Sequence, residues 1–167
     1  MAANRSARAY SLKDITNAVL RNLLGTRCET TAALAIGTTT TKINTVVGAI
    51  VYTIDGKYYT KTGAADIFDL TSATVLQNKA VLAAGQFTTF TCCFDASGNP
   101  LVYQGPVVSA LADISLAELP CDANGNLTVC PVGYVKIASG ASAYTPGTTA
   151  LTGLGTYVNA FLLPSVL

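Results

Sequence analysis

The sequence predicts a mainly β protein, with an antiparallel β-sandwich or barrel-like body that follows one N-terminal amphipathic helix. From about residue 34 onward, segments rich in Thr, Val, Ile and Tyr alternate with Gly, Asn and Asp turn signals. Nearer the start, apolar residues recur at helical spacing. The length of 167 residues suits one hydrophobic core. We therefore divide the chain into a basic arm and helix, residues 1–27, and a β-rich body, residues 28–167.

The stretch "SLKDITNAVLRNLLG" (residues 11–25) predicts the helix. Ser11 and Asp14 form a capping-box-like start, and Gly25 is suited to the residue after the helix end. Its apolar stripe contains Leu12, Ile15, Val19 and Leu23. Basic residues accompany it at Arg5, Arg8, Lys13, Arg21 and Arg27. We expect these nine residues to dock on a neighbouring protein. The alternative is an arm that packs on its own domain.

A β-hairpin is predicted within "TTTTKINTVVGAIVYTIDGKYYTKTG". Its Asp55–Gly56 pair favours a two-residue turn. A register centred there places Tyr52 opposite Tyr59, and such a pair stabilises a sheet by about 0.2–1 kcal/mol. We interpret these tyrosines as structural before we consider a sugar-binding platform.

The remaining elements follow in order. "SATVLQNKAVLAAG" is compatible with a short helix or with a loop and a strand. "QFTTFTCCF" and "PLVYQG" predict strands joined by the turn "DASGN", and "SALADISLAELP" predicts a long connection. "NLTVCPVGYVKIAS" predicts strands broken at Pro131, "AYTPGTT" a turn, and "GTYVNAFLLPSVL" a terminal strand.

Two stretches share an Asp, a Gly and an Asn at the same spacing: Asp95–Asn99 and Asp122–Asn126. They are compatible with β-turns or with oxygen-rich calcium loops. An EF-hand loop needs alternating ligands over twelve residues and a terminal bidentate Glu, which neither stretch supplies. Gly and Asn tolerate the positive φ of hairpin turns. We therefore predict turns, and calcium bridged between several subunits stays as the alternative.

The chain has five cysteines and no CxxC pair. Cys92 and Cys93 are neighbours in a predicted strand, so their side chains point to opposite faces and do not bridge each other. A turn centred on Gly125–Asn126 would place Cys121 opposite Cys130. That pairing permits a disulfide, although two thiols are expected in a reducing compartment.

Composition argues against several functional classes. The chain contains no His, which removes the usual general base and the commonest zinc ligand, and its carboxylates are few and scattered. We expect no enzyme activity, catalytic residue, metal or cofactor. No apolar run approaches the roughly 18 residues of a membrane-spanning helix. The net charge is only +1 and no basic stripe is interleaved with aromatic residues, which argues against a nucleic-acid partner.

The order of several phrases resembles small bacteriophage virion proteins of the capsid decoration, cement or head-fibre kind. These phrases are "IGTTTTKINT…YTIDGKYYTKT", "FDASGNPLVYQG", "PVGYVKI" and "AYTPGTTAL", and they cover about residues 36–157. The resemblance implies a β-sandwich or barrel-like body that forms trimers on a capsid lattice, with an arm or short helix that contacts the shell. It implies no enzyme site.

The resulting hypothesis is a structural virion protein, made in the host cytoplasm, that decorates and reinforces the capsid surface. Its expected partners are the major capsid protein and two further copies of itself. Only 11% of the residues are charged, which suits a surface covered by other subunits. The alternative is a phage fibre or receptor-binding head that recognises a host glycan through Tyr52, Tyr58, Tyr59 or Tyr103.

Overall fold

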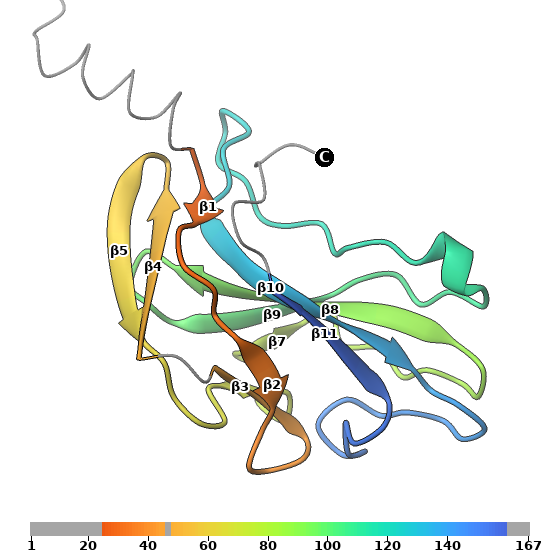
Figure 1. Cartoon of the computed structure of the whole chain (residues 1–167). Coiled ribbons are helices and arrows are strands. Elements are labelled where there is room, and N and C mark those ends of the chain that lie inside the picture. Colours follow the sequence, from red (N-terminus) through yellow and green to blue (C-terminus); the bar gives the residue numbers. More distant parts are fainter. Residues whose placement is uncertain (1–24, 46–47, 160–167) are drawn as a thin grey trace, which may run out of the picture.

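A computed structural model describes residues 25–45 and 48–159 of the chain. Within these ranges the protein is mainly β, and its strands form three sheets (Figure 1). The predicted β class is confirmed there, while the predicted N-terminal helix lies outside the described residues. Over the same ranges, no helix combines the length and apolar character needed to cross a membrane.

The largest sheet has five strands in the order β11-β10-β8-β9-β7. All of its neighbours pair antiparallel except β7 and β9, which are parallel. The bounds are β7 (Leu76–Gln77), β8 (Phe87–Asp95), β9 (Pro100–Gln104), β10 (Val129–Ala138) and β11 (Gly155–Asn159). The two longest strands, β8 and β10, pair with each other at the centre of this sheet.

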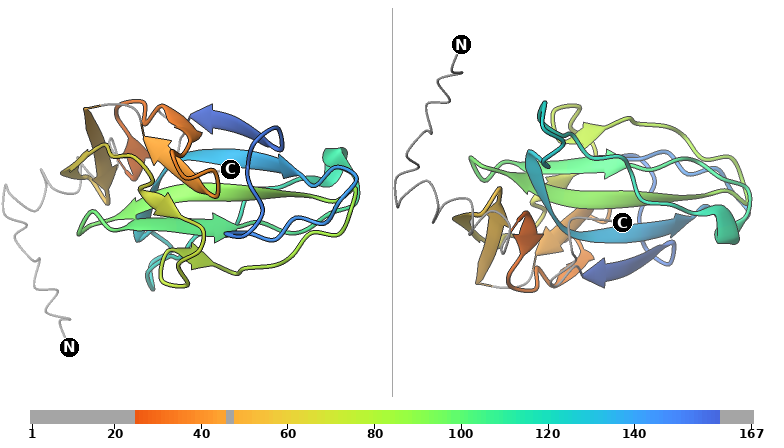
Figure 2. Two further views of the ribbon diagram at one scale, coloured as in Figure 1. Left: turned by 90° about the horizontal axis from the view of Figure 1, so that it is seen from below. Right: turned by 90° about the horizontal axis from the view of Figure 1, so that it is seen from above.

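Two smaller sheets lie on the same side of the large one, as Figures 1 and 2 show. One has the order β1-β4-β5, and its strands are β1 (Arg27–Cys28), β4 (Ala49–Ile54) and β5 (Lys57–Thr62). The other has the order β2-β3-β6, with β2 (Leu34–Ile36), β3 (Lys42–Thr45) and β6 (Phe68–Asp69). The first contacts β10 through β1 and β4, and the second contacts β11 through β2 and β9 through β6.

One hydrophobic cluster fills the space between the sheets. All three sheets contribute, for example through Tyr52, Phe68 and Phe94, each of which is at most 1% exposed. Burying one large apolar side chain contributes about 1.5–3 kcal/mol, so this cluster is the main source of stability. The smaller sheets are therefore held to the large one by shared apolar burial.

Strand β8 is buried on both of its faces. Cys92 belongs to the hydrophobic cluster, whereas Cys93 is fully buried on the opposite face, as the alternation of a strand requires. On that opposite face Thr89 donates a hydrogen bond from Oγ1 to the Ser115 carbonyl at 2.7 Å. Ser115 belongs to the connection between β9 and β10, which also contains the 3-10 helix η1 (Leu111–Asp113). This connection therefore covers part of the outer face of β8.

The predicted hairpin at Asp55–Gly56 is confirmed. Both turn residues have positive φ, 51° and 74°, as a type I′ turn requires. The register pairs Tyr52 with Tyr59, and their rings stack with centroids 5.6 Å apart.

The structure decides two further predictions. Residues 71–86 form turns, loop and the short strand β7, so the helical alternative for "SATVLQNKAVLAAG" is wrong. The predicted break at Pro131 is also wrong, because β10 continues through it with a register shift between Pro131 and Gly133. A Cβ on Gly133 would lie 2.7 Å from the Val158 carbonyl oxygen, so the residue after the irregularity must be small.

Candidate functional site

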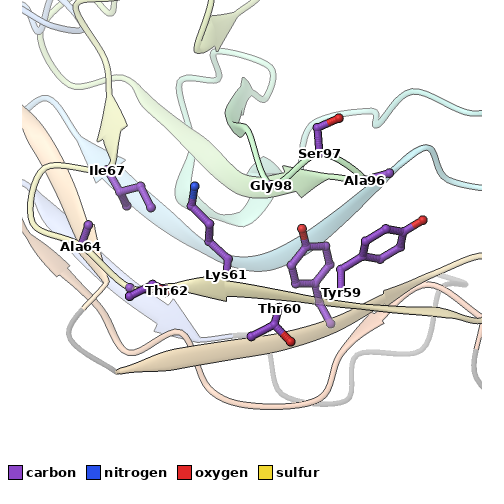
Figure 3. Close-up of a pocket in the computed structure, with 11 residues that line it drawn as sticks. Tyr59, Thr60, Lys61, Thr62, Ala64, Ile67, Ala96, Ser97 and Gly98 are labelled. Atoms are coloured by element: carbon purple, nitrogen blue, oxygen red, sulfur yellow. The ribbon is translucent and has the colours of Figure 1, made fainter.

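A groove lies between strand β5 and the turn that joins β8 to β9, and it is drawn in Figure 3. Its volume of about 550 Å³ is within the usual range for small-molecule sites. The groove is lined by Tyr52, Tyr59, Thr60, Lys61, Thr62, Gly63, Ala64, Ile67, Ala96, Ser97 and Gly98. Two segments that are 29 residues apart at their nearest, Ile67 and Ala96, thus form its walls.

Strand alternation explains which side chains β5 presents to the groove. Tyr59 pairs with Tyr52, and Lys61 pairs with Ile50, and both partners belong to the buried face of β4. Tyr59 and Lys61 therefore share the face of β5 that is directed toward the large sheet, and Figure 3 shows both on the groove side. Each is half-buried.

The Tyr59 ring is the outer end of a row of aromatic rings that runs into the core. It stacks on Tyr52 at an interplanar angle of 22°. Tyr52 contacts Phe94 at 5.7 Å between centroids, and Phe94 contacts Phe68 at 5.2 Å. These separations are typical of favourable aromatic pairs. The row connects all three sheets and holds the Tyr59 ring in place.

Tyr52 is itself fixed by a hydrogen bond. Its hydroxyl donates to the Asp95 carbonyl oxygen at 2.8 Å. Burial, with a smaller contribution from the Asp95 charge, raises the pKa of Tyr52 to about 12. Since Tyr52 is 1% exposed, it supports the groove from behind and offers little surface to a ligand.

The turn Asp95–Asn99 forms the opposite wall. Within it, the Asp95 carboxylate accepts hydrogen bonds from other residues of the same turn. Asp95 Oδ1 accepts hydrogen bonds from the backbone N–H groups of Ser97 and Asn99, both at 2.8 Å. Asn99 Nδ2 donates to Asp95 Oδ2 at 2.8 Å. Gly98 has φ of 77° and donates its N–H to the Asp95 carbonyl. The predicted turn is confirmed.

The second Asp-containing stretch is built in the same way. Asp122 Oδ1 accepts the N–H groups of Asn124 and Asn126 at 2.8 and 2.9 Å, and Gly125 has φ of 82°. The hydrogen bond from the Asn126 N–H is the main reason why the pKa of Asp122 lies below its ordinary value. Both stretches are therefore three-residue hairpin loops with a glycine in the left-handed region. The described residues contain no group of three or more His, Cys, Asp or Glu side chains placed to hold a metal.

The four tyrosines named from the sequence are not brought together as a set. Tyr52 and Tyr59 meet at the groove. Tyr58 points to the other face of β5 and is 60% exposed. Tyr103 lies in β9 opposite Thr91, on the outer face of the large sheet, and burial raises its pKa. Only Tyr59 offers a groove ligand a fixed and partly exposed ring.

The disulfide that the sequence would permit between Cys121 and Cys130 is not formed, and both thiols are free. The hairpin loop closes with Asp122 bonded to Asn126, which places Cys121 opposite Leu127. Cys130 instead pairs with Phe94 in the large sheet and is fully buried, whereas Cys121 is exposed. The predicted turn is centred on Gly125–Asn126, whereas the hydrogen bonds of Asp122 centre the observed loop on Asn124.

Eight of the nine proposed docking residues lie outside the described residues: Arg5, Arg8, Leu12, Lys13, Ile15, Val19, Arg21 and Leu23. The ninth, Arg27, lies in β1 as part of the body. Its Nε pairs with Glu29 Oε1 at 2.7 Å, and its backbone N–H donates to Thr53 Oγ1 at 3.2 Å.

The sequence does not indicate Lys61 as a groove residue, and it indicates Ser97 and Gly98 only as part of the Asp95–Asn99 turn. Alternation along β5 was a usable signal for Lys61, because it shares a face with Tyr59. Nothing local indicated that the Asp95–Asn99 turn would lie against that face.

Comparisons with protein-family models, curated proteins and solved structures find no match for this chain.

Proposed function

We propose that the protein is a non-enzymatic structural component of a bacteriophage virion that decorates and reinforces the capsid as a homotrimer. In this proposal the β-rich body is a sandwich, and the basic N-terminal segment contacts the major capsid protein. Two small sheets packed against one face of a larger sheet support the sandwich description. The resemblance in segment order supports the virion class.

The observation that carries the proposal is the way the body uses its reactive side chains. Carboxylates serve local structure: Asp66 accepts hydrogen bonds from Thr39, Asp69 pairs with Lys42 at 2.9 Å, and Asp95 closes a turn. Four of the five thiols are buried. These three carboxylates therefore hold local structure, and the four buried thiols are shielded from solvent, as a structural role for the body would require.

The proposed mechanism is thermodynamic linkage. A protein that binds across adjacent capsomers binds the assembled shell and not its dissociated subunits, so it stabilises the assembled state by mass action. A stable contact of this kind buries more than about 1,000 Å² in total. Several weak contacts per trimer add up through multivalency, because the second and third attach at a high effective concentration.

The test is co-sedimentation of the full chain with expanded empty capsids. We expect a variant with Gln at Arg5, Arg8, Lys13 and Arg21 to lose attachment while its β circular dichroism is unchanged. The matched control places Gln at Lys57 and Lys79, which are exposed on the body, and should still bind. Light scattering of the free protein should give the mass of a trimer.

Two results would overturn this proposal. One is attachment by the arm variant, or by a chain that lacks residues 1–25, at the level of the full protein. The other is a monomer in solution that also attaches singly to capsids.

A second candidate function is recognition of a host-surface glycan by a fibre or receptor-binding head. The observation that favours it is the groove beside Tyr59, with its rigid ring and nearby cation.

A further inference from the structure

The groove between β5 and the Asp95–Asn99 turn contains a rigid aromatic surface. Tyr52 supports one side of the Tyr59 ring, and Tyr52 is in turn held by Phe94 and by its hydrogen bond to Asp95. Ordering a flexible side chain on binding costs about 0.5–1.5 kcal/mol, and a ring already held in place avoids most of that cost. Such a surface suits a flat ligand with apolar C–H groups on one face.

The groove also carries a positive charge that the described part of the body leaves without an ion pair. No carboxylate of that part lies within 4.0 Å of the Lys61 ammonium, unlike Lys42, which pairs with Asp69 at 2.9 Å. The residues that line the groove include no acid. Lys61 thus provides a site for an anionic group, partly shielded from water because the side chain is half-buried.

Gly98 lies beside the lysine. A Cβ at this glycine would lie 3.5 Å from Lys61 Cδ and 3.9 Å from both Lys61 Nζ and the Tyr52 hydroxyl. These are ordinary van der Waals distances, so the lysine stem packs along the turn at Gly98. Ser97, next to it, adds an exposed hydroxyl to the same wall. Figure 3 shows Lys61 directed from β5 toward this turn.

We propose that this groove binds a saccharide unit that carries a carboxylate, such as a uronic or sialic acid. The sugar ring stacks on Tyr59, the carboxylate pairs with Lys61, and Ser97 hydrogen-bonds to a ring hydroxyl. A saccharide fits better than an acidic peptide, because the groove presents a ring and a hydroxyl beside its single cation and has Ile67 as its one aliphatic side chain larger than alanine. The volume of about 550 Å³ suits a small ligand.

This inference deepens the glycan-binding candidate and does not depend on capsid attachment. The capsid proposal and the saccharide proposal can be tested separately, because the arm variant tests capsid binding and leaves the groove residues unchanged. Conversely, groove variants leave the arm intact.

The experiment applies the full-length protein to an array of oligosaccharides that carry glucuronic, galacturonic or sialic acid, each beside its neutral analogue. NMR titration with the saccharide that binds best then shows, from the changes in amide chemical shifts, where on the protein it binds. We expect shifts at Lys61, Ser97 and Gly98, and at least tenfold weaker binding of the neutral analogue. That factor corresponds to about 1.4 kcal/mol, which one charge-assisted hydrogen bond readily supplies.

Matched variants separate the roles of the two side chains. Lys61→Met keeps the stem and removes the charge, so it should abolish the preference for the acidic sugar, whereas Lys57→Met on the same strand should not. Tyr59→Leu should weaken both sugars, and Tyr59→Phe should retain binding because the ring remains. The dispersion of the amide spectrum checks that each variant is folded.

The proposal is overturned if no acidic saccharide on the array binds, or if the shifts lie away from the groove. It is equally overturned if Lys57→Met and Lys61→Met have the same effect. A triglutamate peptide that binds as well as the acidic sugar, with no loss on Tyr59→Leu, would show plain ion pairing in place of sugar recognition.

Discussion

At the scale of single residues, Tyr52 connects the core with the groove. Its ring lies between Tyr59 and Phe94, and its hydroxyl bonds to the Asp95 carbonyl. Removing only the hydroxyl, as in Tyr52→Phe, should reduce the free energy of unfolding by about 1 kcal/mol. In a chain of this size that lowers Tm by about 2–4 °C. Thermal unfolding at pH 7 measures the change, and Tyr58→Phe, at an exposed position, should alter Tm by much less.

The same hydroxyl gives a dependence on alkaline pH. Burial raises the pKa of Tyr52 from 10.0 to about 12, so the unfolded chain loses this proton before the folded chain does. The contribution of the protonated Tyr52 hydroxyl to the free energy of unfolding is fully present below pH 10, and it is lost as the pH rises through 12. The Tyr52→Phe variant should therefore lose less stability between pH 10 and 12 than the unchanged protein does. Urea unfolding at each pH measures the free energy of unfolding. An unchanged slope would contradict the buried position of the hydroxyl.

At the scale of elements, the two Asp-initiated turns depend on a glycine in the left-handed region. A Cβ on Gly125 would meet no atom within 4 Å, so replacing it by Ala adds backbone strain and no collision. We expect Gly125→Ala to reduce the free energy of unfolding by about 1–2 kcal/mol. Gly48, equally uncrowded and without positive φ, is the matched control, and Gly48→Ala should cause no loss. Equal effects of the two substitutions in urea unfolding would exclude the strain explanation.

At the scale of the whole molecule, burial separates the five thiols into two classes. Cys121 is exposed, whereas Cys28, Cys92, Cys93 and Cys130 are buried. Burial raises the pKa of Cys28 to about 11 and raises those of the other buried thiols further. Because the thiolate is the reactive form, a disulfide-exchange reagent at pH 8 should label one thiol rapidly in the native protein and all five in urea. Rapid native labelling of two or more, or of none, would contradict this arrangement.

The packing of the sheets also determines which thiols react rapidly in the folded protein. Cys121→Ser should remove the fast reaction altogether and leave the fold unchanged, because its side chain is exposed. The buried thiols then react only as fast as the sheets separate, so their labelling rate reports the opening of the core.

The sequence by itself determined the local features of this protein. Asp55–Gly56 fixed the hairpin and placed Tyr52 opposite Tyr59, and the Asp95 and Asp122 stretches each encoded a turn. These features depend on φ preferences and on hydrogen bonds between residues at most a few positions apart, so short stretches contain the necessary information.

Only the tertiary structure decided which distant segments meet. It placed Cys130 opposite Phe94, away from Cys121, and it brought the turn at Gly98 against Lys61. Alternating patterns specify the faces of a strand but not its neighbours, since any strand with the same period can supply the same hydrogen bonds and apolar face. The choice of partners is made by burying all three sheets in one core, and the groove is a consequence of that choice.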